Sequence, residues 1–153
     1  MSSSTIDTKG IMKLFDEFGE RPRTQVFKRT SRRAGNILIR NTRRELRAID
    51  TNSGALKSRT KNRWNGRTME WGVRQRVARK GYWTDVGLKD DFRLKFFELG
   101  TTDRTTKRGD FRGRISAHYF FKKAKEKSKT EIFTTQEQII RREINWVNNK
   151  YNK

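Results

Sequence analysis

The sequence has no cysteine, a single histidine (His118) and a single proline (Pro22). Without cysteine the chain forms neither disulfides nor thiolate metal sites. One histidine offers little to a nucleophile–base pair or to a histidine-rich metal site. Glycine-rich nucleotide-binding motifs are also missing, so we expect no cofactor.

Long apolar runs are missing as well. No stretch of the sequence approaches the length of a membrane span, so we expect no membrane partner. The polar beginning lacks an apolar signal-peptide segment, so we expect the protein to stay in the cell that makes it. Apolar residues make up only 31% of the 153 residues, and many of them are aromatic. A few large side chains must therefore supply much of the packing of one domain.

Positive charge is what the chain has in excess. Lys and Arg number 38 against 17 Asp and Glu, which gives a formal net charge of +21. Such a balance indicates a polyanionic partner, either nucleic acid or acidic protein neighbours. Composition alone does not separate the two, because phosphate binding needs only basic side chains within reach.

We divide the chain into an N-terminal arm with a short helix (residues 1–21), a main domain (22–130) and a C-terminal helix (131–153). A long helix is predicted from Pro22 to Ile49, since proline suits the first turn of a helix. At helical spacing the apolar face of that helix gathers Phe27, Ala34, Leu38, Leu46 and Ile49. The opposite side carries a stripe of arginines that is either a solvated face or a contact surface for DNA or an acidic subunit: Arg29, Arg33, Arg40, Arg44 and Arg47.

The middle of the chain is predicted to be antiparallel sheet. Strands at 56–64 and 69–77 flank Asn65-Gly66, a strong hairpin signal. Further strands are expected at 92–99 and at 82–86, where apolar and polar residues alternate. The predicted fold class is therefore α+β, with a long N-terminal helix packed on a small antiparallel β-sheet and followed by C-terminal helices.

A polar loop and two helices complete the prediction. The loop at 101–113 holds Arg104, Lys107, Arg108 and Arg112, and loops of this length are often functional. After Ser116 a helix is expected to turn Phe120, Phe121 and Ala124 inward. A separate last helix is expected after residues 134–137, which resemble a capping box.

Two groups of residues each allow a functional and a structural interpretation. Glu98, Asp103, Asp110 and His118 could gather as a nuclease-like metal site, although their spacing matches no known ligand pattern. In the structural reading, Glu98 ends a strand and either faces solvent or pairs with an arginine. Four aromatic residues either stack single-stranded bases or fill the core: Trp64, Trp71, Tyr82 and Trp83.

Three short segments occur in a fixed order: DTNSGALKS at 50–58, FFELGT at 96–101 and AHYFFKKA at 117–124. In this order they resemble the bacteriophage tail-component family, whose members join or complete the head–tail connection, a group similar to minor tail protein Z. Asn52 and Ser53 are extra to the first motif, and Ala117 and Lys123 replace the two prolines of the third. The residues that match the family are read as scaffold: Asp50, Gly54, Leu56, Glu98, Gly100, Thr101, Phe120 and Ala124.

The resemblance implies a non-enzymatic α+β subunit of a virion, present in the host cytoplasm during assembly. It implies a closed ring at the neck or upper tail, with a hexamer favoured and a dodecamer as the alternative near the portal. Duplex DNA would pass through the lumen, and other neck and tail proteins would lie above and below. Six copies at +21 each bring about 126 positive charges, whereas the duplex inside a ring about 40 Å tall offers only about 24 phosphates. We therefore expect acidic neighbours to take a larger share of the charge than DNA in the lumen. A stand-alone basic nucleic-acid-binding protein is the alternative function.

Overall fold

The computed structural model describes residues 20–49, 61, 66–80 and 83–151. Their elements, in chain order, are the helix α2 (Glu20–Arg47), the 3-10 turn η2 (Met69–Gly72), the strands β1 (Val73–Val77) and β2 (Thr84–Leu88), and the helices α3 (Arg93–Leu99) and α4 (Phe120–Tyr151). The α+β prediction is confirmed, with α2 packed on a two-stranded antiparallel sheet. The expected short helix at 11–18 lies outside the described residues.

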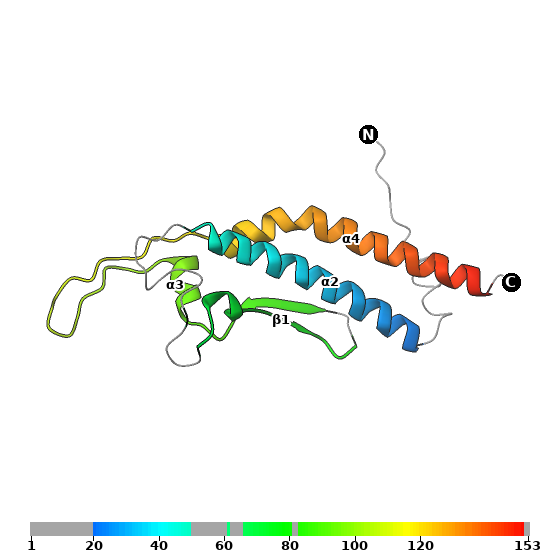
Figure 1. Ribbon diagram of the computed structural model, residues 1–153, viewed down its shortest axis with the longest axis horizontal. Coiled ribbons are helices and arrows are strands. Elements are labelled where there is room, and N and C mark those ends of the chain that lie inside the picture. The colour runs from blue at the N-terminus through cyan, green and yellow to red at the C-terminus, as the bar shows by residue number, and fades with distance from the viewer. Residues whose placement is uncertain (1–19, 50–60, 62–65, 81–82, 152–153) are drawn as a thin grey trace, which may run out of the picture.

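Helix α2 occupies the middle of the molecule. Figure 1 shows α4 along one side of it, antiparallel to it, and the two strands along the other side. Because two elements cover α2, it buries more than one face. Ala34 and Leu46 are buried as predicted, but Val26 and Ile37 are buried too. A single amphipathic stripe was therefore too narrow a description of this helix.

Both strands of the sheet overlap predicted strands, β1 lying within 69–77 and β2 overlapping 82–86, but they pair with each other and not across the Asn65-Gly66 hairpin. Strand β1 pairs with β2 from Val73 opposite Leu88 to Val77 opposite Thr84. Across the Asn65-Gly66 signal the described chain makes only an isolated bridge, between Lys61 and Thr68. The segment after it begins as the turn η2, so that Trp71 is 58% exposed and does not join the core face. Residues 56–60 and 62–65 lie outside the described residues.

The strand predicted at 92–99 is wrong, because this segment forms the helix α3. Its alternation of aromatic and basic residues imitated a strand. The buried side chains are instead Leu94 and Phe97, three positions apart, which is helical spacing. Phe92 and Phe96, which helped to create the alternation, are exposed and contact each other edge to face.

The two helices expected at the end of the chain are a single helix, α4. The capping-box residues 134–137 lie inside it and begin no helix. The β-branched residues around 130–135 favour a helix poorly. Helix α4 continues through them because it packs against α2 along much of the length of α4.

The apolar core lies at one end of the molecule. It joins Leu46, Met69, Val73, Leu94, Phe97 and Phe120, contributed by α2, η2, β1, α3 and α4. Phe120 is 1% exposed and Ala124 is fully buried, as the sequence predicted. Outside this core, the other buried side chains of α2 and α4 are mostly small or polar, together with two larger apolar ones: Thr30, Ala34, Asn41, Thr42, Ala124 and Ser128 beside Val26 and Ile37. None of the described helices combines the length and apolar character that a membrane crossing requires.

Candidate interaction surfaces and the motif scaffold

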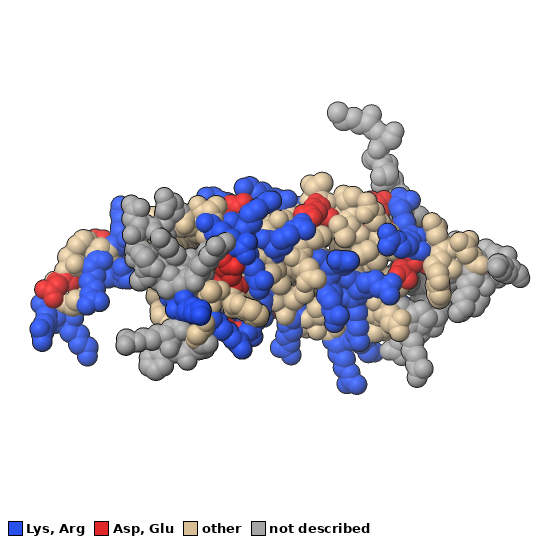
Figure 2. All heavy atoms as spheres, in the orientation of Figure 1, with Lys and Arg blue, Asp and Glu red and all other residues tan. Residues whose placement is uncertain are grey.

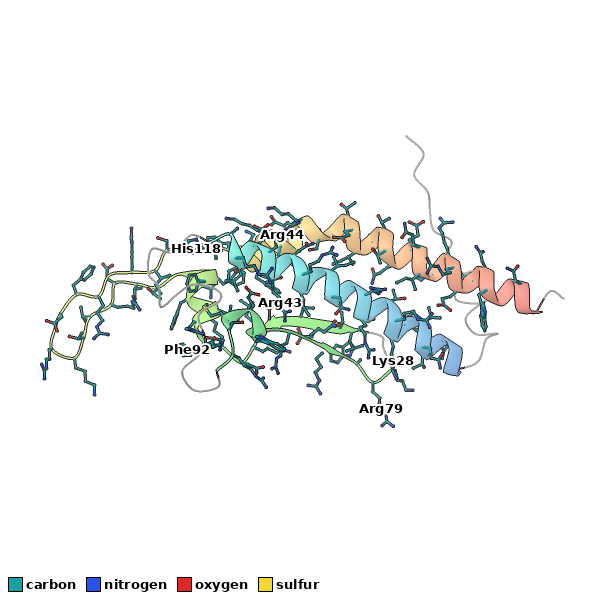
Figure 3. The ribbon with its side chains drawn as sticks, in the orientation of Figure 1. Lys28, Arg43, Arg44, Arg79, Phe92 and His118 are labelled. Carbon is teal, nitrogen blue, oxygen red and sulfur yellow. The ribbon has the colours of Figure 1, made fainter. Side chains whose placement is uncertain are left out.

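The arginine stripe of α2 divides into paired and unpaired side chains. Arg29 pairs with Glu143 and Arg40 pairs with Glu131, both on α4. Arg47 donates two hydrogen bonds to the carboxylate of Glu70, at 2.8 and 2.7 Å. Arg33 and Arg44 are exposed and form no ion pair with a described side chain, although the charge of Arg44 helps to lower the pKa of Glu131. Figure 3 places Arg44 near the start of α4. Three members of the stripe therefore hold α2 to its neighbours.

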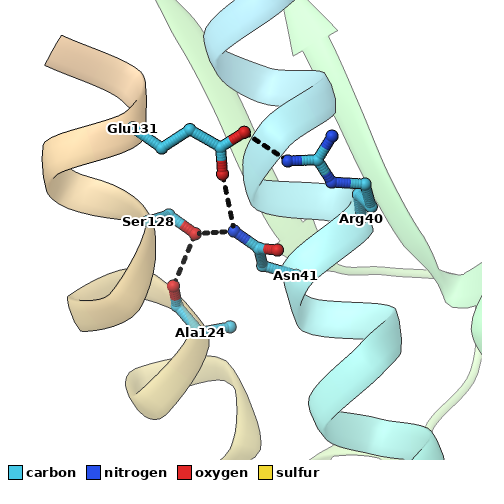
Figure 4. A network of polar contacts seen from close by, with 5 residues as sticks. All are labelled: Arg40, Asn41, Ala124, Ser128 and Glu131. Atoms are coloured by element: carbon cyan, nitrogen blue, oxygen red, sulfur yellow. Dashed lines mark hydrogen bonds and ion pairs between the residues drawn. The ribbon is translucent and has the colours of Figure 1, made fainter. Parts of the chain in front are cut away.

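The seam between α2 and α4 contains a buried polar network, drawn in Figure 4. The amide nitrogen of Asn41 donates to the hydroxyl of Ser128 at 2.9 Å and, more weakly, to Glu131 at 3.4 Å. Ser128 in turn donates to the carbonyl of Ala124 at 2.6 Å. The hydrogen bond from Arg40 lowers the pKa of Glu131 below its ordinary value, so the pairing across the seam weakens as pH falls through that pKa.

Arg43 is a structural residue that the sequence did not single out. Its guanidinium donates to the backbone carbonyls of Glu70 at 3.0 Å and Val73 at 3.2 Å, which ties α2 to η2 and β1. Burial lowers the pKa of Arg43, although an arginine so placed stays charged. No motif marks this role, because the partners are backbone atoms.

Glu98 performs a role that neither sequence reading anticipated. Its carboxylate accepts hydrogen bonds from the backbone N–H groups of Phe121 at 2.8 Å and Lys122 at 3.2 Å. These groups lie in the first turn of α4, where N–H groups lack partners within the helix and the helix dipole favours a negative charge. The predicted choice between solvent and an arginine partner was wrong, since Glu98 caps α4.

Replacing Glu98 with alanine should therefore destabilise the protein by about 1–2 kcal/mol, because two helix N–H groups lose their acceptor. Glutamine at this position should cost less, because it keeps one oxygen acceptor. Urea unfolding followed by circular dichroism measures the change. Glu126→Ala is the matched control, since Glu126 is an exposed carboxylate of α4 without a described partner. An equal effect in the two alanine variants would contradict the capping role.

The other residues of this motif join the same corner. The N–H of Thr101 donates to the carbonyl of Ile115, and the hydroxyl of Thr101 accepts from the N–H of Ile115, both at 2.9 Å. The N–H of His118 donates to the carbonyl of Phe97 at 2.9 Å. Glu98, Gly100, Thr101, Phe120 and Ala124 thus form a scaffold that fixes α3, the segment 101–115 and α4 relative to one another. Asp50, Gly54 and Leu56 lie outside the described residues.

Residues 101–115, here called the arm, form a hairpin that projects away from the body of the molecule (Figure 1). Thr105 and Phe111 form an antiparallel bridge, and Thr106 donates its N–H to the carbonyl of Asp110 at 2.8 Å. A tight turn closes the tip, where the N–H of Gly109 donates to the carbonyl of Thr106 at 3.0 Å. The segment expected as a polar loop is therefore a loop folded back on itself as a hairpin, with one β-bridge and no regular strand.

The arm presents different side chains on its two faces. Thr105 and Phe111 are directly opposite each other and so share one face, and Phe111 is 69% exposed. Alternation puts Arg104 and Arg112 opposite each other on the second face. All the arm's basic side chains are exposed: Arg104, Lys107, Arg108, Arg112 and Arg114.

Acidic side chains are nearly all engaged within the molecule. Among those that the structure describes, only Asp103 and Glu126 neither accept a hydrogen bond nor form an ion pair. Several exposed cations have no acidic partner among the described residues, including Arg33, Arg76, Lys107, Arg108 and Lys123. Figure 2 shows basic atoms over both the arm and the body, with acidic atoms in small separate spots. The free charge of the described surface is therefore almost entirely positive.

The nuclease-like group does not assemble in the described part of the chain. No group of three or more His, Asp or Glu side chains lies close enough together there to hold a metal ion. Glu98 caps α4, and Asp110 accepts a hydrogen bond from Thr106 at 3.0 Å. The ring of His118 packs near that of Phe97, with 6.0 Å between centroids.

The four aromatic residues proposed for stacking or for the core are partly placed. Trp71 and Trp83 are more than half exposed, so the core reading is wrong for these two. Trp64 and Tyr82 lie outside the described residues.

Comparison with known proteins adds no relative. No protein-family model matches the chain, and neither a curated protein nor a solved structure does. The resemblance to tail-component proteins therefore depends on the three sequence motifs, and the function below is a proposal.

Proposed function

We propose that this chain is a non-enzymatic structural protein of a tailed bacteriophage. It forms a homo-oligomeric ring at the neck or upper tail and acts in head–tail joining or tail completion. The hexamer is favoured and the dodecamer is the alternative. Adjacent neck and tail proteins with acidic surfaces are its neighbours in the virion.

The observation that carries this proposal is that two motif residues, Glu98 and Thr101, make hydrogen bonds that orient neighbouring elements. Glu98 binds the first turn of α4, and Thr101 closes the base of the arm. Both residues set the direction of a projecting element, and neither meets a second titratable group in a cleft. A motif that orients an arm against a helix is what an assembly subunit needs, because its interfaces depend on shape.

Exposed apolar side chains also support an assembled state. Phe92, Phe96 and Leu99 follow one another at helical spacing along one side of α3, and Phe92 and Leu99 are more than 60% exposed. Phe133 on α4 is 63% exposed. Apolar surface left open in a monomer is typical of a protein that buries it against another.

Sedimentation velocity of the purified full-length chain, with and without duplex DNA, tests the proposal. We expect a single closed oligomer without DNA, and we expect it to persist as salt is raised, because its contacts are partly apolar. A monomer at every protein concentration would contradict the proposal.

The alternative function, a stand-alone nucleic-acid-binding protein, is favoured by the excess of exposed cations without acidic partners. It predicts a monomer that binds DNA or RNA with an affinity that falls steeply as salt rises. The same sedimentation experiment separates the two functions. The structural protein is expected to be an oligomer without nucleic acid, whereas the stand-alone binding protein is expected to be a monomer.

A further inference from the structure

The arm carries a dense group of positive charges that no described acidic side chain pairs with. Its five basic side chains face two aspartates, and one of these, Asp110, already accepts a hydrogen bond from Thr106. The arm projects from the body (Figure 1), and its basic side chains form no ion pair with a described acidic side chain. Their charge is therefore open to an anionic partner.

The cross-strand arginine pair strengthens this argument. Like charges directly opposite each other on a hairpin destabilise it. The guanidinium of Arg104 makes only long hydrogen bonds, to the carbonyls of Gly113 at 3.3 Å and Arg112 at 3.4 Å. A phosphate between the two side chains would accept stronger hydrogen bonds from both and relieve their repulsion.

A second copy of the chain is a poor occupant for this surface. Nearly all described acidic side chains are committed to internal partners, so the described surface of another copy offers the arm few free carboxylates. Duplex DNA is the better occupant, since it offers a dense and regular array of phosphates. It also fits in chemistry, since basic side chains and threonine hydroxyls are common phosphate contacts.

Phe111 adds an exposed apolar side chain to the arm, which attraction between charges alone does not require. It is exposed on the face opposite the arginine pair, next to Thr105. Apolar side chains of DNA-binding proteins contact thymine methyl groups or wedge between base steps. We propose that the arm is a duplex-DNA-binding hairpin loop, in which the basic side chains contact phosphates and Phe111 contacts the bases.

The test uses the full-length chain and a fluorescein-labelled duplex of about 20 base pairs, with binding followed by anisotropy over a range of salt. The arm variant replaces Lys107, Arg108 and Arg112 with glutamine. The matched control replaces Lys122, Lys123 and Lys125, which are exposed at the start of α4, with glutamine. Both variants lose the same charge, so only the location differs. Circular dichroism and thermal melting check that each variant is folded.

We expect the arm variant to bind about 100-fold more weakly at about 0.15 M salt and the slope of log K against log salt to fall by about 3. The control should lose less than about 5-fold, from its lower net charge alone. Phe111→Ala should weaken binding about 10-fold without changing the salt slope, because it removes a contact with bases and no phosphate contact.

Equal losses in the two triple variants would overturn the proposal, since DNA would then respond to total charge. An arm variant that binds like the unmodified protein would also overturn it and would leave an acidic protein as the partner of the arm. Unchanged binding by Phe111→Ala would overturn the base contact. The sedimentation of every variant is recorded as well. A ring without arm-dependent binding counts against this inference alone, and arm-dependent binding by a monomer counts against the ring alone.

Discussion

Gly100→Ala is expected to destabilise the protein by about 3 kcal/mol, which for a chain of this size lowers the melting temperature by roughly 8 °C. Gly100 has a φ of 74° and a ψ of −176°, a conformation that side chains with a Cβ avoid. A Cβ there would meet the backbone nitrogen of Ala117 and the carbonyl of Ile115, each at 2.9 Å. Both are backbone atoms, and the carbonyl of Ile115 is held by a hydrogen bond from Thr101, so the scaffold that directs the arm has to shift.

Gly109→Ala is the matched control for this change. Gly109 also has a positive φ, 88°, but nothing lies within 4 Å of an added Cβ. Its replacement should cost only the conformational strain, about 1 kcal/mol. Thermal melting of both variants makes the comparison. Equal losses would mean that the close approach at the base of the arm is not a constraint on the fold.

Asn41→Asp is expected to cost about 3 kcal/mol at neutral pH, because it puts a carboxylate in a buried position beside Glu131. Asn41 is 4% exposed and donates to both Ser128 and Glu131. An ionised aspartate donates to neither. Burial and the neighbouring carboxylate should raise the pKa of the new side chain, so the loss should shrink as pH falls and the group becomes protonated.

Asn36→Asp is the control for the second change. Asn36 is exposed, and its oxygen accepts a hydrogen bond from Gln75 at 2.7 Å, which aspartate also accepts. Its replacement should change stability by less than about 0.5 kcal/mol. Urea unfolding at about pH 7 and about pH 4 measures both variants. A loss for Asn41→Asp that does not depend on pH would contradict the buried network of Figure 4.

The sequence predicted the fold where a single physical signal dominated. The long helix is observed within two residues of its predicted bounds, and its buried Ala34 and Leu46 were both expected. The segment 92–99 misled because its exposed aromatics alternate with cations, and local alternation does not reveal which residues are buried. The continuity of α4 was missed because it depends on contacts with α2, whose partner residues are about a hundred positions away.

The candidate surfaces were predicted only in part. The basic side chains of the arm were identified from their density in a polar segment, but the hairpin that displays Phe111 was not. The arginine stripe was predicted to be either a solvated face or a contact surface for a partner. Three of its members, Arg29, Arg40 and Arg47, instead pair with acidic side chains of the same chain. The one available signal for the seam is Asn41, which continues the buried positions Ala34 and Ile37 at helical spacing.

The measurement that bears most directly on this account is electron microscopy of the purified full-length chain. If the protein acts by shape as a subunit of a neck or tail ring, class averages will show closed annular particles of one rotational symmetry in the absence of nucleic acid. Isolated single copies at every concentration tried, or particles that form only on DNA, would contradict the central claim and favour the stand-alone nucleic-acid-binding protein.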